Sequence, residues 1–171
     1  MSTLVLTLLG LVAVWWWLAR MRVSRKPVGM VATRIHFPDG GVALHDADKA
    51  VTGLRNPEEI VIPFDHAILV IEYPLSNPAS IGIQASLSQG FTRAELVRTV
   101  CEEYANVYEA EEATADTKTI PKEERTILRN RNRTDGVYGI WGHDLEDLTL
   151  TAIRWTRAPD GNVKIELHVQ S

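Results

Sequence analysis

Cysteine is nearly absent from this 171-residue sequence, with Cys101 as the single example. One cysteine cannot form an intrachain disulfide or build a thiolate cage around a metal ion. Cys101 also falls on the apolar stripe of a predicted helix, which favours a small buried hydrophobe over a reactive nucleophile. The cysteine content therefore agrees with a reducing compartment.

The short motifs of the common enzyme classes are also missing. The sequence has no Walker-type phosphate loop, no Gly-x-Gly-x-x-Gly fingerprint, no His-Glu-x-x-His motif and no nucleophile elbow. These absences lean toward a non-enzymatic protein without deciding the question. No cofactor and no metal site are predicted.

Charged side chains are lacking from residue 2 to residue 19, and this stretch is almost wholly apolar. As a helix its 18 residues would span about 27 Å, close to the roughly 30 Å thickness of a bilayer core. The sequence therefore predicts a single transmembrane helix in contact with the lipid bilayer. Its expected lipid-facing and interfacial residues are Leu4, Leu8, Leu11, Trp15, Trp16 and Trp17.

A basic cluster follows the apolar stretch and contains Arg20, Arg22, Arg25 and Lys26. A cleaved signal peptide would carry its basic residues before the apolar run, so it is the less favoured alternative, with a buried or amphipathic helix behind it. The positive-inside rule predicts a single-pass membrane protein with its C-terminal domain in the cytoplasm and the bilayer bound through residues 1–26.

The boundaries of the soluble part follow from composition. We expect residues 1–27 to form the anchor and its basic flank, and residues 28–171 to form one domain. The chain after residue 26 carries 14 basic and 22 acidic side chains, a net charge of −8. An acidic domain is a poor candidate for broad nucleic-acid binding, because Lys and Arg supply most of that affinity.

The domain is predicted to be α+β. Short runs rich in Val and Ile indicate strands at residues 28–37, 59–63, 67–73 and 80–87. Helical periodicity, with Thr92 and Glu95 as a capping box, indicates one long helix from Arg93 to Ala113. Residues 148–157 and 162–170 form the clearest hairpin. This order favours a largely antiparallel sheet packed against one long helix.

The densest group of chemical side chains lies between Tyr138 and Leu148. His143, Asp144 and Asp147 could provide a general base or ligands for a divalent metal. The alternative interpretation, which we favour, is a solvated turn with a hydrogen-bonded histidine, because a metal site needs three or four converging ligands.

Basic residues are concentrated just before this group. Arg125, Arg129, Arg131 and Arg133 could bind an anion or an acidic partner. The alternative is a solvated loop whose cations pair with nearby acidic residues, including Glu123, Glu124 and the acidic end of the long helix. We favour this second interpretation.

Two segments, residues 90–97 and 130–148, resemble a family of small proteins found in large nucleocytoplasmic DNA viruses and in plants and protists. The resemblance covers roughly residues 65–155 and implies no catalytic residue. It implies a fold shared between hosts and viruses. The predicted anchor, the acidic domain and the lack of a complete catalytic motif favour a membrane-anchored, non-enzymatic structural or interaction protein with protein partners. In a virus this would be a minor capsid or virion membrane component, located at an internal membrane or the capsid. The alternative function is a membrane-tethered hydrolase or metal-dependent enzyme that uses His143 with Asp144 or Asp147.

Overall fold

The computed structural model of the chain describes residues 32–37, 40–126 and 130–171. Eight strands, two α-helices and two short 3-10 helices follow one another in this part of the chain. In order they are β1 Ala32–His36, β2 Val42–Ala43, α2 Ala47–Thr52, β3 Ile60–Ile62, β4 His66–Ile71, β5 Ala79–Gln84, β6 Phe91–Thr92, α3 Arg93–Thr114, η1 Lys122–Glu124, η2 Leu145–Asp147, β7 Thr149–Arg157 and β8 Val163–Gln170.

The main sheet has the strand order β1-β7-β8-β4-β5, and β2 also pairs with β7. Four of its pairings are antiparallel, but β4 runs parallel to β8, with Leu69 opposite Ile165. Strands β3 and β6 form a separate small ladder. The fold is therefore α+β with a mixed sheet.

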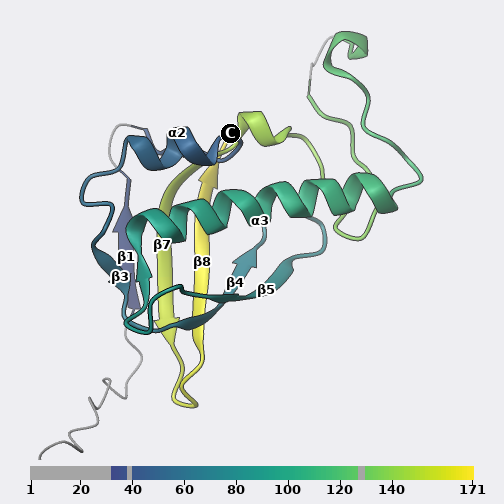
Figure 1. Cartoon of the computed structure of the whole chain (residues 1–171). Coiled ribbons are helices and arrows are strands. Elements are labelled where there is room, and N and C mark those ends of the chain that lie inside the picture. The colour runs from purple at the N-terminus through teal and green to yellow at the C-terminus, as the bar shows by residue number, and fades with distance from the viewer. Residues whose placement is uncertain (1–31, 38–39, 127–129) are drawn as a thin grey trace, which may run out of the picture.

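Helix α3 lies across one face of the main sheet, with α2 near its N-terminal part (Figure 1). The stripe that faces the sheet is buried and consists of Leu96, Val97, Val100, Cys101, Tyr104 and Val107. The opposite face of the sheet carries exposed polar side chains such as Lys164 and His168 of β8. One face of the sheet thus holds the core and the other meets solvent.

The start of α3 is fixed by its N-cap. The Thr92 hydroxyl accepts a hydrogen bond from the Glu95 N–H at 3.1 Å, as the sequence predicted. The Glu95 carboxylate does not complete the predicted capping box, because it accepts a hydrogen bond from the Ser86 N–H at 2.6 Å instead. This contact ties the loop after β5 to the first turn of the helix.

The prediction of a largely antiparallel sheet missed the parallel β4–β8 pairing, which joins segments almost a hundred residues apart. It also missed the short elements β2, β6 and α2, which are too brief to show a periodic pattern. The long helix and the C-terminal hairpin lie within one residue of the expected bounds.

The predicted fold class, which included an N-terminal transmembrane helix, is also corrected by the structure. No helix among the described residues is both long enough and apolar enough to cross a membrane. The one long helix, α3, carries charged side chains such as Arg98 and Glu102 on its exposed face, as a helix packed on a sheet does. The anchor predicted at residues 1–27 lies outside the described residues.

We expect Val100→Asp to lower the free energy of unfolding by about 3 to 5 kcal/mol, because it places an unpaired carboxylate in the core. Val100 is 0% exposed at the centre of the α3 stripe. The matched control is Ala105→Asp, on the exposed face of the same helix, which should cost less than about 1 kcal/mol. Urea unfolding checks both values, and a Val100→Asp midpoint equal to that of the parent would show that the stripe is not core.

Candidate functional site

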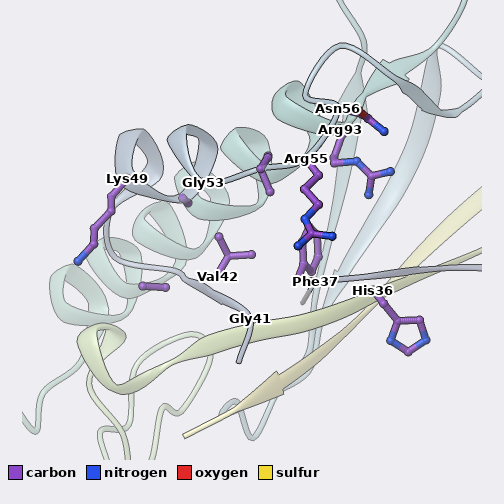
Figure 2. A pocket seen from close by; sticks show the side chains of 12 residues that line it. His36, Phe37, Gly41, Val42, Lys49, Gly53, Arg55, Asn56 and Arg93 are labelled. Atoms are coloured by element: carbon purple, nitrogen blue, oxygen red, sulfur yellow. The ribbon is translucent and has the colours of Figure 1, made fainter. Parts of the chain in front are cut away.

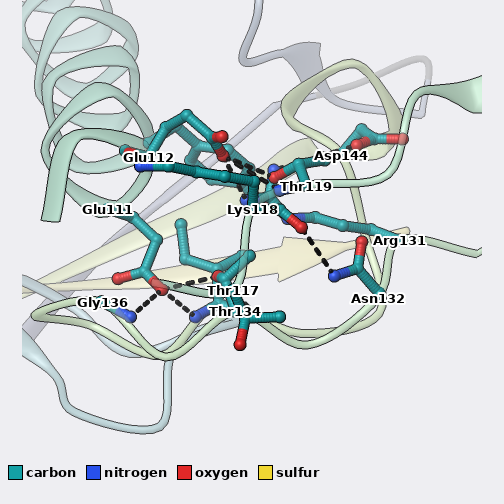
Figure 3. A network of polar contacts seen from close by, with 12 residues as sticks. Glu111, Glu112, Thr117, Lys118, Thr119, Arg131, Asn132, Thr134, Gly136 and Asp144 are labelled. Carbon is teal, nitrogen blue, oxygen red and sulfur yellow. Dashed lines mark hydrogen bonds and ion pairs between the residues drawn. The ribbon is translucent and has the colours of Figure 1, made fainter. Parts of the chain in front are cut away.

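The segment that the sequence marked as chemically dense is held in place by a residue from another element, Glu111 of α3. This side chain is 0% exposed, and its carboxylate accepts five hydrogen bonds from residues 134–140, which lead into and overlap the start of that segment. Figure 3 shows Glu111 beside two of the donors, Thr134 and Gly136. The donors are the Thr134 hydroxyl at 2.6 Å and the backbone N–H groups of Gly136 at 2.9 Å, Tyr138 at 2.8 Å, Gly139 at 3.0 Å and Ile140 at 3.3 Å. Residues 134–140 therefore fold around a buried anion.

Two glycines allow this close approach. A Cβ atom on Gly136 would lie 2.6 Å from both the backbone oxygen and the Oε2 atom of Glu111, a distance that real side chains do not adopt. Gly139 has a φ of +64°, a left-handed conformation that costs glycine little. Gly136 and Gly139 thus allow the backbone of residues 134–140 to approach the Glu111 carboxylate.

The hydrogen bonds also determine the ionisation of Glu111. Burial alone would raise its pKa, but donation from Thr134, Tyr138, Gly139 and Gly136 outweighs burial and lowers the pKa below the usual value of a glutamate. The carboxylate is therefore ionised at neutral pH, as its five donors require.

The predicted site residue Asp144 lies at the centre of an ion-pair network. It accepts hydrogen bonds from both terminal nitrogens of Arg125, one of them at 3.0 Å. Arg131 and Lys122 approach the same carboxylate at 3.9 Å and 3.7 Å. Burial would raise the pKa of Asp144, but the Arg125 guanidinium and the other two cations hold it below its usual range.

The other two predicted site residues have separate structural contacts. The Asp147 carboxylate accepts a hydrogen bond from the Asp144 N–H at 3.0 Å, at the start of η2. The His143 ring lies 5.6 Å from the Tyr73 ring and 6.3 Å from the Trp141 ring, and its Nε2 atom is 3.3 Å from the Ser171 hydroxyl. His143 and Asp147 line the same open polar cleft. No group of three or more candidate metal ligands converges in the part of the chain that the structure describes.

Two of the arginines predicted to bind an anion, Arg125 and Arg131, contact other residues within the protein. The side chains of Arg125 and Arg131 are only 5% and 6% exposed, and the Arg131 guanidinium lies 5.2 Å from the centre of the Tyr108 ring. Arg133 donates a hydrogen bond to the Ser76 hydroxyl at 3.1 Å. Arg129 lies outside the described residues. Arg125 and Arg131 thus act as internal ties, whereas Arg133 is exposed and contacts Ser76 at the surface.

A groove of about 540 Å³ lies between α2 and the β1–β2 segment (Figure 2). Its lining combines apolar side chains, such as Phe37 and Leu54, with the cations Lys49, Arg55 and Arg93. Arg93 is ion-paired with Glu59 at 2.7 Å. His36 also lines the groove, and no carboxylate or hydroxyl side chain is among the described lining residues.

The free edge of strand β5 is a different kind of site, made of backbone groups. The Ala85 N–H donates to the Asp65 oxygen at 2.8 Å, in the same register as the β4–β5 ladder. Because bonded and non-bonded pairs alternate in an antiparallel ladder, Ser80, Gly82 and Gln84 direct their N–H and C=O groups away from β4. These three residues are exposed, and no described residue pairs with their backbone.

The sequence interpretation missed Glu111 as an organising residue and treated it as part of an acidic helix end. A signal was present, because Glu111 follows Tyr104 and Val107 at the spacing of the buried stripe. A carboxylate at a position on this buried stripe needs hydrogen-bond donors from inside the protein. The sequence interpretation also missed the β5 edge, because strand order is not visible in the local pattern.

A scan against family models, a search of curated proteins and a search of solved structures give no match to this chain.

We expect Glu111→Gln to lower the free energy of unfolding at pH 7 by about 2 to 4 kcal/mol, because an amide presents N–H groups to some of the converging donors. The folded-state pKa of Glu111 is lowered, so its contribution is present above the unfolded pKa of about 4.3 and is lost as pH falls through the folded value. The gap between parent and variant should narrow below about pH 4.

Denaturant melts at pH 7 and pH 3 measure this change. Glu109→Gln is the matched control, since Glu109 lies on the exposed face of the same helix turn. A gap between parent and Glu111→Gln that stays constant with pH would contradict the proposed role of the charge.

Proposed function

We propose that this protein is a non-enzymatic interaction module that pairs with an extended segment of a partner polypeptide along the free edge of β5. The observation that carries the proposal is the row of unpaired backbone groups on Ser80, Gly82 and Gln84, along a six-residue strand at the edge of the sheet. Strand addition to such an edge is a common mode of peptide recognition, in which backbone hydrogen bonds provide affinity.

The composition of the edge supports the proposal. Natural proteins usually protect an exposed edge with charged residues, proline or a bulge. The opposite edge strand, β1, carries Arg34 and His36 as exposed residues. Strand β5 has no charge, no proline and no register shift, and the sequence contains no charged side chain from residue 73 to residue 92. The β1 edge thus has the charged residues that discourage pairing with another strand, and the β5 edge lacks them.

The state of the chemical side chains also supports a non-enzymatic function. A general base works best when its pKa lies near the operating pH. The pKa values of Glu111 and Asp144 are instead lowered by hydrogen bonds and ion pairs that also fix their positions. The carboxylates of Glu111 and Asp144 thus stabilise the conformation of the loops that contact them, which is a structural role.

The resemblance of residues 90–97 and 130–148 to proteins of large DNA viruses suggests where such an interaction would take place. Within a virus, a protein of this kind would be a component of an assembly such as the capsid. The β5 edge would then supply one of its contacts with a neighbouring polypeptide.

We expect a synthetic peptide with the sequence of residues 78–86 to bind the full-length protein and to slow hydrogen exchange at Ser80, Gly82 and Gln84. These amides face the free edge and should exchange rapidly in the unbound chain, whereas pairing supplies them with acceptors. Mass spectrometry of exchanged fragments, run on dilute protein with excess peptide, measures the protection.

The control changes only the backbone of the peptide. Methylation of the peptide nitrogen at the position of Gly82 removes a donor that would face the protein, and binding should fall at least about tenfold. Methylation at the position of Ile81, on the outward edge of the bound peptide, should be tolerated better. Protection elsewhere in the chain with none at β5 would reject the proposal.

The alternative function as a metal-dependent enzyme has its own test at His143 and Asp147. A metal that binds only the folded protein at 100 times its Kd would add about 2.7 kcal/mol of stability. We expect no thermal shift with zinc, manganese, magnesium or calcium. A stabilisation that disappears in both His143→Ala and Asp147→Ala would favour the enzyme.

A further inference from the structure

We propose that the partner at the β5 edge is a second copy of this chain, paired antiparallel about a two-fold axis that passes through Gly82. This inference rests on the proposed function, since it names the polypeptide that the edge receives. It draws on the sequence of the strand, the direction of its free groups and the position of the exposed apolar residues.

The sequence around Gly82 has the same pattern in both directions. Residues 79–85 are Ala-Ser-Ile-Gly-Ile-Gln-Ala, so that equivalent positions carry alanine, a polar side chain and isoleucine on either side of the glycine. Two antiparallel copies related by a two-fold axis through Gly82 place Ser80 opposite Gln84, and Ile81 opposite Ile83, of the second copy. A strand with this symmetry is complementary to itself.

The direction of the free backbone groups fits the same register. With Gly82 opposite Gly82 of the second copy, Ser80 lies opposite Gln84, and these are the residues whose N–H and C=O groups point outward. All three positions become hydrogen-bonded pairs, because each residue of such a pair exchanges both bonds with its partner. The contact joins two sheets into one continuous sheet.

The side chains are compatible with this pairing on both faces. On the core face, Ile81 is partly buried and would lie opposite Ile83 of the second copy, extending the apolar layer. On the solvent face, Ser80 and Gln84 are exposed and can hydrogen-bond to each other. The absence of charge from residue 73 to residue 92 removes the like-charge repulsion that usually opposes the pairing of identical edges.

Two exposed apolar residues lie beyond the two ends of the strand. Leu87 is 48% exposed after the C-terminal end of β5, and Val137 is 52% exposed beside the N-terminal end. Val137 is held there because its oxygen accepts a hydrogen bond from the Asn77 side chain at 3.2 Å. In the two-fold register, Asn77 comes opposite Leu87 of the second copy. The pairing would therefore bring the two exposed apolar groups toward each other.

Site-specific disulfide formation tests the register. A cysteine at residue 82 would meet its equivalent at about 5.5 Å between Cα atoms, within the range that a disulfide spans. A Cβ atom at Gly82 meets nothing within 4 Å, so the substitution fits the fold. We expect Gly82→Cys in the full-length protein to form a covalent dimer under mild oxidation. The parent, whose only cysteine is the buried Cys101, gives the background.

Two further variants separate the register from random collision. Residue 80 of one copy would lie four residues, or about 13 Å, from residue 80 of the other, so Ser80→Cys alone should give background dimer only. The same holds for Gln84→Cys alone. An equal mixture of Ser80→Cys and Gln84→Cys proteins should form a disulfide well above background, in the half of the dimers that random pairing makes mixed. Equal crosslinking by all the single variants would overturn the proposal.

A charge variant tests the same contact without oxidation. Gly82→Lys would place two ammonium groups directly opposite each other, and we expect the dimer dissociation constant to rise at least tenfold in sedimentation. The matched control, His168→Lys on the exposed face of central strand β8, should leave it unchanged. If the peptide of residues 78–86 protects the edge but no dimer forms, the second copy is rejected and the interaction module stands. If neither occurs, both proposals fail.

Discussion

Five hydrogen-bond donors converge on the buried carboxylate of Glu111, and the path of the chain from α3 to β7 depends on this contact. A carboxylate without water is strongly unfavourable unless donors replace its hydration, and here a hydroxyl and four backbone N–H groups from residues 134–140 do so. The segment therefore has little conformational choice. Once it is fixed, Ile140 forms a bridge with Leu75, and Trp141 donates its N–H to the Pro74 oxygen.

The ion pairs around Asp144 extend the same constraint to the loop that leaves α3. Arg125 and Arg131 come from the stretch before residue 134, and their side chains are nearly inaccessible to solvent. Because a buried cation needs a nearby anion, the position of Asp144 determines where this loop lies. The loop also places Arg131 over the Tyr108 ring and so returns to α3. The charged residues that are concentrated in this part of the sequence thus hold the loop after α3 against that helix.

Features of the fold that depend on local sequence patterns were predicted, and features that depend on contacts between distant residues were missed. The stripe of α3 and the hairpin of β7 and β8 are local patterns, with periods that a single segment reveals, and both were predicted. The parallel pairing of β4 with β8 was not, because it joins residues that no local pattern relates. The role of Glu111 was missed for a related reason, since its donors lie 23 or more residues away in sequence. His143 and Asp144 were noticed for their chemistry, but their partners could be found only in three dimensions.

The contrast between the two sheet edges bears on whether pairing would end at a dimer. An edge that accepts any strand risks open-ended assembly, whereas a two-fold contact uses the same edge of both copies and leaves only the other edges free. In this protein the remaining edge, β1, carries Arg34 and His36. The register is also selective, because pairing centred on Gly82 gives two Ile81–Ile83 contacts, whereas a slip of one copy by two residues leaves only one isoleucine pair. A neutral β5 edge and a charged β1 edge on the opposite side of the sheet therefore favour a closed pair over a fibre.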